Sequence, residues 1–250
     1  MILAGVKKIV FICQDEHKSS FIKLLGDGHR WGLSIEYVIQ AKPEGIPQAF
    51  WLAEKYLDSA KSIFLGLGDN VLYGPGAGRS LNVVENSNYA QIYCFPIANP
   101  KQFGVIEIGQ EGAIISIEEK PDIPKSNLAI TGFYHFPFSA IELSKKLKKS
   151  IRGEFEIVEL IQNYKNLNLL KANVLPRGTA WLDAGSPEGL LESSEFVSAI
   201  QKRQGLLIGS PDEAAWRVGL IGHEQLISNS NDFRATPYGE ALRKLVTHKS

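Results

Sequence analysis

SIFLGLGDN, residues 62–70, joins a short apolar run to a turn that carries a carboxylate. The run has the length and the β-branched and aromatic content of a buried strand over residues 62–67. Residues 6–13 and 33–39 have the same strand character, and each is followed by a helical pattern of apolar residues. The order strand, helix, strand, helix, strand predicts a parallel, doubly wound α/β sheet.

The pattern changes in the middle of the chain. Gly109-Gln110-Glu111-Gly112 separates two short apolar runs, which predicts a β-hairpin inserted into the α/β core. The other elements expected downstream are strands over 89–97, 129–136 and 169–175, helices over 138–149 and 154–164, and helical structure beyond Ser186. We therefore expect an α/β core over residues 1–185 and a helical C-terminal subdomain over residues 186–250.

Composition excludes several classes of protein. Among 250 residues, 27 Lys plus Arg balance 27 Asp plus Glu, so the basic excess of a broad nucleic-acid surface is missing. No apolar run reaches transmembrane length. Charged residues follow the first apolar residues after too few positions for these to form a signal peptide. Cys13 and Cys94 lie in apolar runs, as buried reduced thiols do. We expect a cytoplasmic protein that binds neither membrane nor nucleic acid.

Two acidic residues stand at the ends of predicted strands. Asp69 follows the strand over residues 62–67, at the edge of an open α/β sheet where ligands bind. Asp183 ends Trp181-Leu182-Asp183 and precedes a helix. Each has a structural alternative, because Gly-Asp-Asn is a common turn and Asp is a good helix N-cap. Together they would form a Mg²⁺ site if the fold brings them close.

Three further segments contain polar residues suited to binding a sugar phosphate or a base. Glu119 and Lys120 end a hairpin strand before Pro121, where they can accept sugar hydroxyls and meet a phosphate, or form a solvated face. Arg152 precedes a helix and can reach a phosphate or belong to the helix start. The loop from Gln40 to Gly45 can hydrogen-bond a base edge or serve only as a connection.

In this order the motifs resemble those of the sugar nucleotidyltransferases, most closely the glucose-1-phosphate thymidylyltransferases. The resemblance covers nearly the whole chain and rests on LLGDGHRWGLSIEYVIQ, PEGIPQAF, LGDNVLYG, QFGVIEI, ISIEEKP, PKSNLAITGFYHF, RGEFEI, RGTAWLDAGSPEGLLES and RQGLLIGSPDEAAWR. It implies a Rossmann-like nucleotidyltransferase sheet and the formation of dTDP-glucose and pyrophosphate from dTTP and glucose 1-phosphate. It also implies Mg²⁺ as the cofactor.

The same resemblance assigns roles by position. Asp69 and Asp183 match the two Mg²⁺-binding carboxylates, and Gln40 and Gly45 match residues that contact the thymine. The sugar-phosphate pocket is matched by Gly104, Glu119, Lys120, Tyr134 and Arg152, with Lys120 and Arg152 at the phosphate. The helical tail beyond Ser186 resembles the family's oligomer-forming region, which implies a homotetramer, with a dimer as the alternative.

The sequence also departs from the family. The family begins with a strand and a Gly-rich loop containing Gly-Thr-Arg-Leu that wraps the triphosphate, and neither occurs in these 250 residues. Since that loop stabilises charge at the reacting phosphorus, we expect little or no activity without it. We also expect unpaired edges on the strands over 6–13 and 62–67. A misassigned start or gene fragment, an inactive copy, and a sugar-nucleotide-binding module remain three alternatives.

Overall fold

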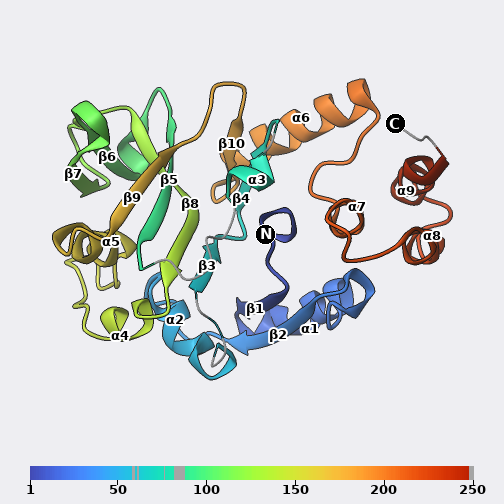
Figure 1. Ribbon diagram of the computed structural model, residues 1–250, viewed down its shortest axis with the longest axis horizontal. Helices are drawn as coiled ribbons and strands as arrows, with labels where there is room; N and C mark the ends of the chain where they lie inside the picture. The colour runs from blue at the N-terminus through green and yellow to red at the C-terminus, as the bar shows by residue number, and fades with distance from the viewer. Residues whose placement is uncertain (58–59, 61, 76, 82–87, 248–250) are drawn as a thin grey trace.

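The computed structural model describes residues 1–247 except 58–59, 61, 76 and 82–87. The strands in these residues are β1 Lys8–Cys13, β2 Ser34–Ile39, β3 Ser62–Gly66, β4 Asn70–Tyr73, β5 Ala90–Pro96, β6 Gly104–Ile108, β7 Ile114–Glu119, β8 Leu128–Pro137, β9 Leu170–Val174 and β10 Ala180–Asp183. The helices are α1 Asp15–Leu25, α2 Gln48–Ala53, α3 Ala77–Ser80, α4 Ala140–Ser144, α5 Ile157–Asn166, α6 Pro187–Gln204, α7 Pro211–Arg217, α8 His223–Asn231 and α9 Pro237–Thr247. Their arrangement is shown in Figure 1.

The long strand β8 organises the largest sheet. Along one edge it pairs with β5, and β5 in turn pairs with β9 in parallel. The other neighbours of β8 are β3, over residues 133–137, and β6, at Ala129. The predicted hairpin is confirmed, because β6 and β7 pair antiparallel. The mixed α/β class is therefore confirmed, although β3 runs antiparallel to β8 rather than in a wholly parallel sheet.

The sheet is interrupted between β1 and β3. β1 pairs in parallel with β2, and these two strands form a sheet of their own. Within the described residues, β1 has no partner besides β2, and β3 has none besides β8. The unpaired edges expected from the sequence are thus confirmed for this part of the chain, and Figure 1 shows β1 and β3 apart.

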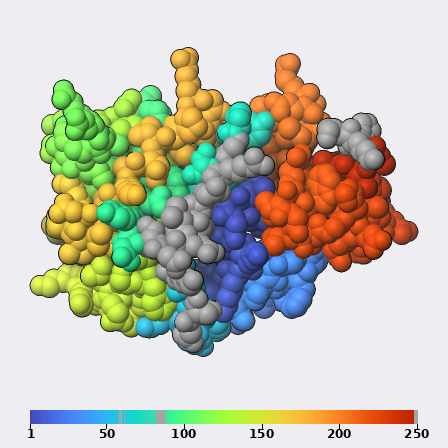
Figure 2. Space-filling model, viewed as in Figure 1, coloured from blue at the N-terminus to red at the C-terminus, as the bar shows by residue number. Residues whose placement is uncertain are grey.

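Three apolar clusters hold these layers together. The first packs β5 and β8 against α2, α4 and α5, with Phe50, Phe136 and Tyr164 nearly inaccessible to solvent. The second packs β1 and β2 against α7, α8 and α9. The third covers the other face of β3, β5 and β8 and includes Ala4 from the 3₁₀ turn Ile2–Ala4. The C-terminal helices therefore share a core with the N-terminal strands, which they adjoin in Figure 2.

The C-terminal helices begin and end at residues that the sequence marks as boundaries. Gly205 adopts a left-handed conformation after α6, where a residue with a Cβ would be strained. Pro211 is the first residue of α7, and Gly222 is the N-cap of α8. The helical prediction beyond Ser186 is confirmed. The proposed division at residue 185 remains a prediction.

Two predicted helices are shorter than expected. The helix over residues 138–149 is reduced to α4, Ala140–Ser144, and α5 begins at Ile157 instead of residue 154. In the second case, residues 150–154 form a turn in which Ser150 N–H donates to the Glu154 carbonyl. Cys13 and Cys94 are buried and free, as predicted. Among the described residues, no helix is both long and apolar enough to cross a bilayer.

Candidate functional site

A cavity of about 270 Å³ opens at the carboxyl end of β3. Its lining brings together seven of the nine residues that the sequence proposed as site residues: Asp69, Gly104, Glu119, Lys120, Tyr134, Arg152 and Asp183. They come from the strands β6, β7, β8 and β10, from the turns that follow β3 and β7, and from the loop between α4 and α5. This is the edge at which open α/β sheets bind their ligands.

Asp69 and Asp183 are separated by more than a hundred positions in the chain and converge on Gly185. A Cβ built on Gly185 would lie 2.9 Å from Asp69 Oδ2 and 3.1 Å from Asp183 Oδ1. The two oxygens are therefore at most about 6 Å apart, so that small side-chain rotations bring both to one ion. The hydrogen atom of Gly185 leaves this space open.

The short β4–β10 ladder creates this convergence. Asn70 is paired directly with Asp183, and the Asp69 carbonyl accepts a hydrogen bond from Ala184 N–H at 2.8 Å. The alternative role of Asp183 as a helix cap is wrong. Ser186 caps α6 by accepting from Gly189 N–H at 3.0 Å, whereas Asp183 Oδ1 accepts from Gly185 N–H.

Asn70 is a site residue that sequence reasoning missed. Its amide Nδ2 donates to Asp69 Oδ1 at 2.7 Å, and its Oδ1 accepts from Gly132 N–H and from Trp181 Nε1. These bonds orient Asp69 and leave its Oδ2 facing Gly185. The signal was present in Gly-Asp-Asn, but the bonds connect residues up to 111 positions apart.

Arg152 stands among three carboxylates in the cavity wall. Its guanidinium nitrogens lie 3.5 Å from Glu119 Oε1, 3.1 Å from Glu154 Oε2 and 3.7 Å from Glu156 Oε1. Burial raises the pKa of Glu119, and the Glu156 charge raises it further, while Lys120 and Arg152 act in the opposite direction. The three ion pairs hold the Arg152 guanidinium at the cavity surface, where an anionic ligand can reach it.

Lys120 and Gly104 lie at the rim where β6 and β7 meet. Lys120 has a left-handed backbone, and its N–H donates to the Phe103 carbonyl at 3.1 Å. Within the described chain its ammonium forms no ion pair, so it is available to an anion. A Cβ on Gly104 would lie only 3.1 Å from Val158 Cγ2, a tight contact, and 3.5 Å from Glu119 Oε2, an ordinary one.

Tyr134, Phe103 and Trp181 belong to the apolar part of the wall. Tyr134 is almost wholly buried, and that burial raises the pKa of its phenol. Phe103 packs edge-on against Trp181 with ring centroids 5.0 Å apart. Sequence reasoning did not assign Trp181 a role, although it lies within the Trp-Leu-Asp motif and lines the cavity.

Gln40 and Gly45 do not line this cavity. Gln40 Nε2 donates to Gln48 Oε1 at 2.7 Å, which leaves its own amide oxygen without a partner in the described part of the structure. Gly45 has φ +115°, and a Cβ there would lie 2.2 Å from the Phe155 carbonyl oxygen. Phe155 and Ile46 do line the cavity. The predicted base-binding loop therefore borders the site from outside.

The charges of the lining residues have a consequence for ligand binding. Five carboxylates and two cationic side chains line the cavity, an excess of three negative charges. An anionic sugar phosphate is repelled by such a surface unless a cation neutralises part of it. Oxygen ligands from one or two carboxylates, completed by water and substrate phosphate, suit Mg²⁺. In the described residues, no third His, Cys, Asp or Glu joins Asp69 and Asp183 to make an all-protein metal site.

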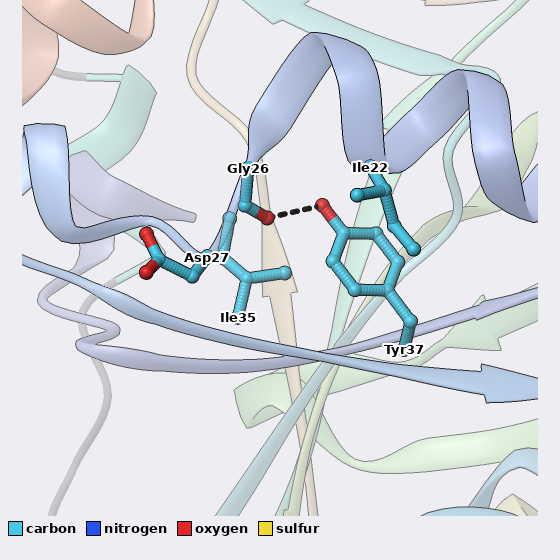
Figure 3. A pocket seen from close by; sticks show the side chains of 5 residues that line it. All are labelled: Ile22, Gly26, Asp27, Ile35 and Tyr37. Atoms are coloured by element: carbon cyan, nitrogen blue, oxygen red, sulfur yellow. Dashed lines mark hydrogen bonds between the residues drawn. The ribbon is translucent and has the colours of Figure 1, made fainter.

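A second cavity, of about 490 Å³, lies between α1 and β2 (Figure 3). It is lined by Ile22, Gly26, Asp27, Ile35 and Tyr37. Its polar groups are already bonded, since Tyr37 O–H donates to the Gly26 carbonyl at 2.7 Å and Asp27 accepts from His29 N–H. It contains none of the predicted site residues, and we assign it no catalytic role.

Comparison with known proteins identifies the family. The family model described as Nucleotidyl transferase matches residues 1–200. The chain belongs to the nucleotidyl transferase family. Among curated members of this family, it is 41% identical to the glucose-1-phosphate thymidylyltransferase of Mycolicibacterium smegmatis and 38% identical to that of Neisseria meningitidis. Both alignments cover 98% of this chain and 85% of the relative.

Solved nucleotidyl transferase structures share the fold. A Bacillus anthracis protein assigned to the glucose-1-phosphate thymidylyltransferases, crystallised with sucrose, aligns with a TM-score of 0.67 and 31% identity. That alignment covers 75% of this chain and 74% of the other. A UDP-glucose pyrophosphorylase bound to UDP-glucose aligns with a TM-score of 0.64 at 18% identity, over 79% of this chain and 83% of the other. The second likeness supports the fold alone.

Proposed function

We propose that this nucleotidyl transferase transfers a thymidylyl group from dTTP to glucose 1-phosphate, forming dTDP-glucose and pyrophosphate. In this reaction a phosphate oxygen of glucose 1-phosphate attacks the α-phosphorus of dTTP, and the bond to the pyrophosphate oxygen breaks. The observation that carries the proposal is the single cavity that gathers seven predicted residues from separate parts of the chain. The relatives named above support the choice of substrates.

Two cations are suited to hold the acceptor phosphate. Lys120 provides a point charge at the rim, and Arg152 provides a planar donor group held by Glu119, Glu154 and Glu156. Glu119 has a partly buried carboxylate that can accept hydrogen bonds from sugar hydroxyls. Reactions of this class depend mainly on position and charge neutralisation, and these residues supply both for the acceptor.

The carboxylates of Asp69 and Asp183 are the proposed Mg²⁺ ligands. Asn70 and Gly185 orient them toward one point, and the excess of negative charge in the cavity favours a cation there. Bound Mg²⁺ would neutralise charge on the reacting phosphates as a Lewis acid. The two carboxylates and their hydrogen bonds determine where that charge is held.

The loop that contains Gln40 and Gly45 is proposed to contact the base. Among the described residues the Gln40 amide oxygen has no hydrogen-bond partner, and the backbone at Gly45 lies directly against Phe155 in the cavity wall. A base bound there would lie beside the acceptor pocket. The preference for thymidine over uridine is part of the proposal, and parallel assays with dTTP and UTP test it.

The test is pyrophosphate release from dTTP and glucose 1-phosphate with Mg²⁺. Asp69→Asn and Asp183→Asn should each abolish release, whereas the matched control Asp122→Asn, on an exposed position after β7, should leave it unchanged. Lys120→Ala and Arg152→Ala should weaken glucose 1-phosphate binding in calorimetry. Release unaffected by both aspartate changes would refute the metal assignment. Binding of dTDP-glucose by the unaltered chain without turnover would instead identify a non-catalytic binding module.

The proposal also includes the oligomeric state of the protein and its location in the cell. The helical tail is proposed to form a homotetramer or dimer, and α6 carries Leu190 and Leu191, two exposed apolar residues. Large exposed apolar residues that are neighbours often belong to an interface. Light scattering tests this, since a monodisperse monomer would contradict it. A cytoplasmic location, the remaining part, is tested by cell fractionation.

A further inference from the structure

The Gln48 side chain connects the two ends of the loop that is proposed to contact the base. Gln48 is the first residue of α2, and its N–H donates to the Gly45 carbonyl at 3.2 Å. Its amide oxygen Oε1 accepts from two donors, Glu44 N–H at 3.0 Å and Gln40 Nε2 at 2.7 Å. One carboxamide therefore joins the residue that follows β2 to the turn that leads into α2.

The polarity of this hydrogen-bond relay is fixed by the backbone. A backbone N–H can only donate, so the atom of Gln48 that faces Glu44 has to be its oxygen. That oxygen can only accept, so Gln40 turns its NH₂ group toward it. Turning either amide over would bring two donors or two acceptors together and leave part-buried polar groups unpaired. The amide oxygen of Gln40 therefore points away from Gln48, and no hydrogen bond to it occurs within the described residues.

Both ends of the relay are held by the surrounding fold. Gln40 N–H donates to the Cys13 carbonyl at 2.9 Å, which continues the pairing of β1 with β2. The Glu44 carbonyl accepts from Phe155 N–H at 2.8 Å. Gly45 is packed so closely that a Cβ built on it would overlap the Phe155 carbonyl oxygen. The loop therefore cannot turn to present the opposite polarity without losing these contacts.

The relay lies beside the cavity that contains the acceptor residues. Ile46 follows Gly45 in the chain, and both Ile46 and Phe155 line the cavity. A base bound next to this cavity would meet the edge of the Gln40 amide that Gln48 leaves open, where the acceptor oxygen is. Thymine has an imide N–H that can donate to such an oxygen. Cytosine has an unprotonated ring nitrogen at the same position, which would set one acceptor against another.

We infer that Gln48 is a positioning residue for base selection, which turns the Gln40 amide so that its acceptor oxygen faces the nucleobase. This inference rests on the proposed function, in which the loop from Gln40 to Gly45 contacts the base. The site then favours a pyrimidine whose ring nitrogen carries a hydrogen over one whose ring nitrogen is an acceptor. Gln48 needs no contact with the base, because it acts through Gln40.

Calorimetry with a matched pair of nucleotides tests this selection. dTDP and 5-methyl-dCDP have the same methyl group, sugar and diphosphate, and they differ only at the ring nitrogen and the exocyclic group beside it. The original chain should bind dTDP at least about tenfold more tightly, because the mismatched base leaves polar groups unpaired at the contact.

Three protein variants separate positioning from loss of the fold. Gln48→Met keeps the length of the side chain and removes the acceptor, so the Gln40 amide can turn over and the preference should fall below about threefold. Gln48→Glu keeps an oxygen toward both donors and should retain the preference. The matched control Gln162→Met, on an exposed amide of α5 that donates to Asn166, should also retain it. Thermal unfolding verifies that each variant is folded.

A measurement without nucleotide tests the orientation of the Gln40 amide directly. Its NH₂ protons and the Glu44 N–H proton are directed at the same oxygen, so the two groups should give a nuclear Overhauser contact. This contact should persist in Gln48→Glu and disappear in Gln48→Met.

Three results would overturn the inference. The first is the absence of the Overhauser contact in the original chain. The second is a preference for dTDP in Gln48→Met equal to that of the original chain. The third is no preference, or no binding of either nucleotide, in the original chain. Pyrophosphate release keeps this outcome separate from that of the proposed reaction. Turnover of dTTP with an unchanged preference in Gln48→Met refutes the positioning role alone, whereas selection that depends on Gln48 without turnover refutes the reaction alone.

Discussion

Changing Tyr238 to Phe should destabilise the packing of the C-terminal helices on the rest of the chain. Tyr238 O–H donates to Asp212 Oδ2 at 2.7 Å, and Asp212 is 1% exposed. The other carboxylate oxygen accepts from Asn229 Nδ2 at 2.7 Å and lies 3.7 Å from Arg30 Nη2. Asn229 Nδ2 also donates to the Arg30 carbonyl. This network connects α7, α8 and α9 to the turn before β2.

The magnitude follows from the loss of one donor to a buried charge. A hydrogen bond to a charged group contributes about 1.5–3 kcal/mol, so the free energy of unfolding should fall by about 2 kcal/mol. A chain of this size loses about 2–4 °C in Tm per kcal/mol, so Tm should fall by about 4–8 °C. The benzene ring and its contact with Phe233 remain, which keeps the packing nearly unchanged.

Calorimetry and urea unfolding measure this loss. The matched control is Tyr73→Phe, whose hydroxyl donates to an exposed neutral acceptor, Gln204 Oε1, at 2.9 Å. It should cost less than about 1 kcal/mol. In the Asp212→Asn background, Tyr238→Phe should cost less than it does alone, because the charge is gone. If Tyr238→Phe costs no more than the control, the buried carboxylate is not what the phenol stabilises.

Four other predictions follow from the structure. Gly185→Ala places a Cβ 2.9 Å from Asp69 Oδ2, so Mg²⁺-dependent turnover should fall at least tenfold with Tm nearly unchanged, and an unchanged rate would contradict the site. Gly45→Ala, with φ +115° and 2.2 Å to Phe155, should lower Tm by several degrees. Ser186→Ala should cost about 1 kcal/mol in urea unfolding through loss of the α6 cap. Burial lowers the pKa of His135, so the unfolded chain binds more protons below about pH 6.5. Stability should therefore fall as pH drops through this range, by up to about 1.4 kcal/mol per unit, and a His135→Leu variant should lose this component of the pH dependence.

The sequence alone determined the local elements and the family. Apolar runs of the right length located the strands, and Gly205, Pro211 and Gly222 marked helix boundaries, because these signals depend only on neighbouring residues. The order of motifs identified the nucleotidyl transferase family, which the comparisons confirm. The carboxylates at strand ends also suggested the edge of the sheet at which the cavity opens.

Only the tertiary structure decided which residues meet. Periodicity cannot specify that β4 pairs with β10, and that pairing places Asp69 beside Asp183 and makes Ser186, rather than Asp183, the helix cap. It likewise cannot predict that Arg152 faces three carboxylates, or that β3 lies antiparallel to β8. These outcomes depend on long-range packing and hydrogen bonding, where local preferences are equal for several partners.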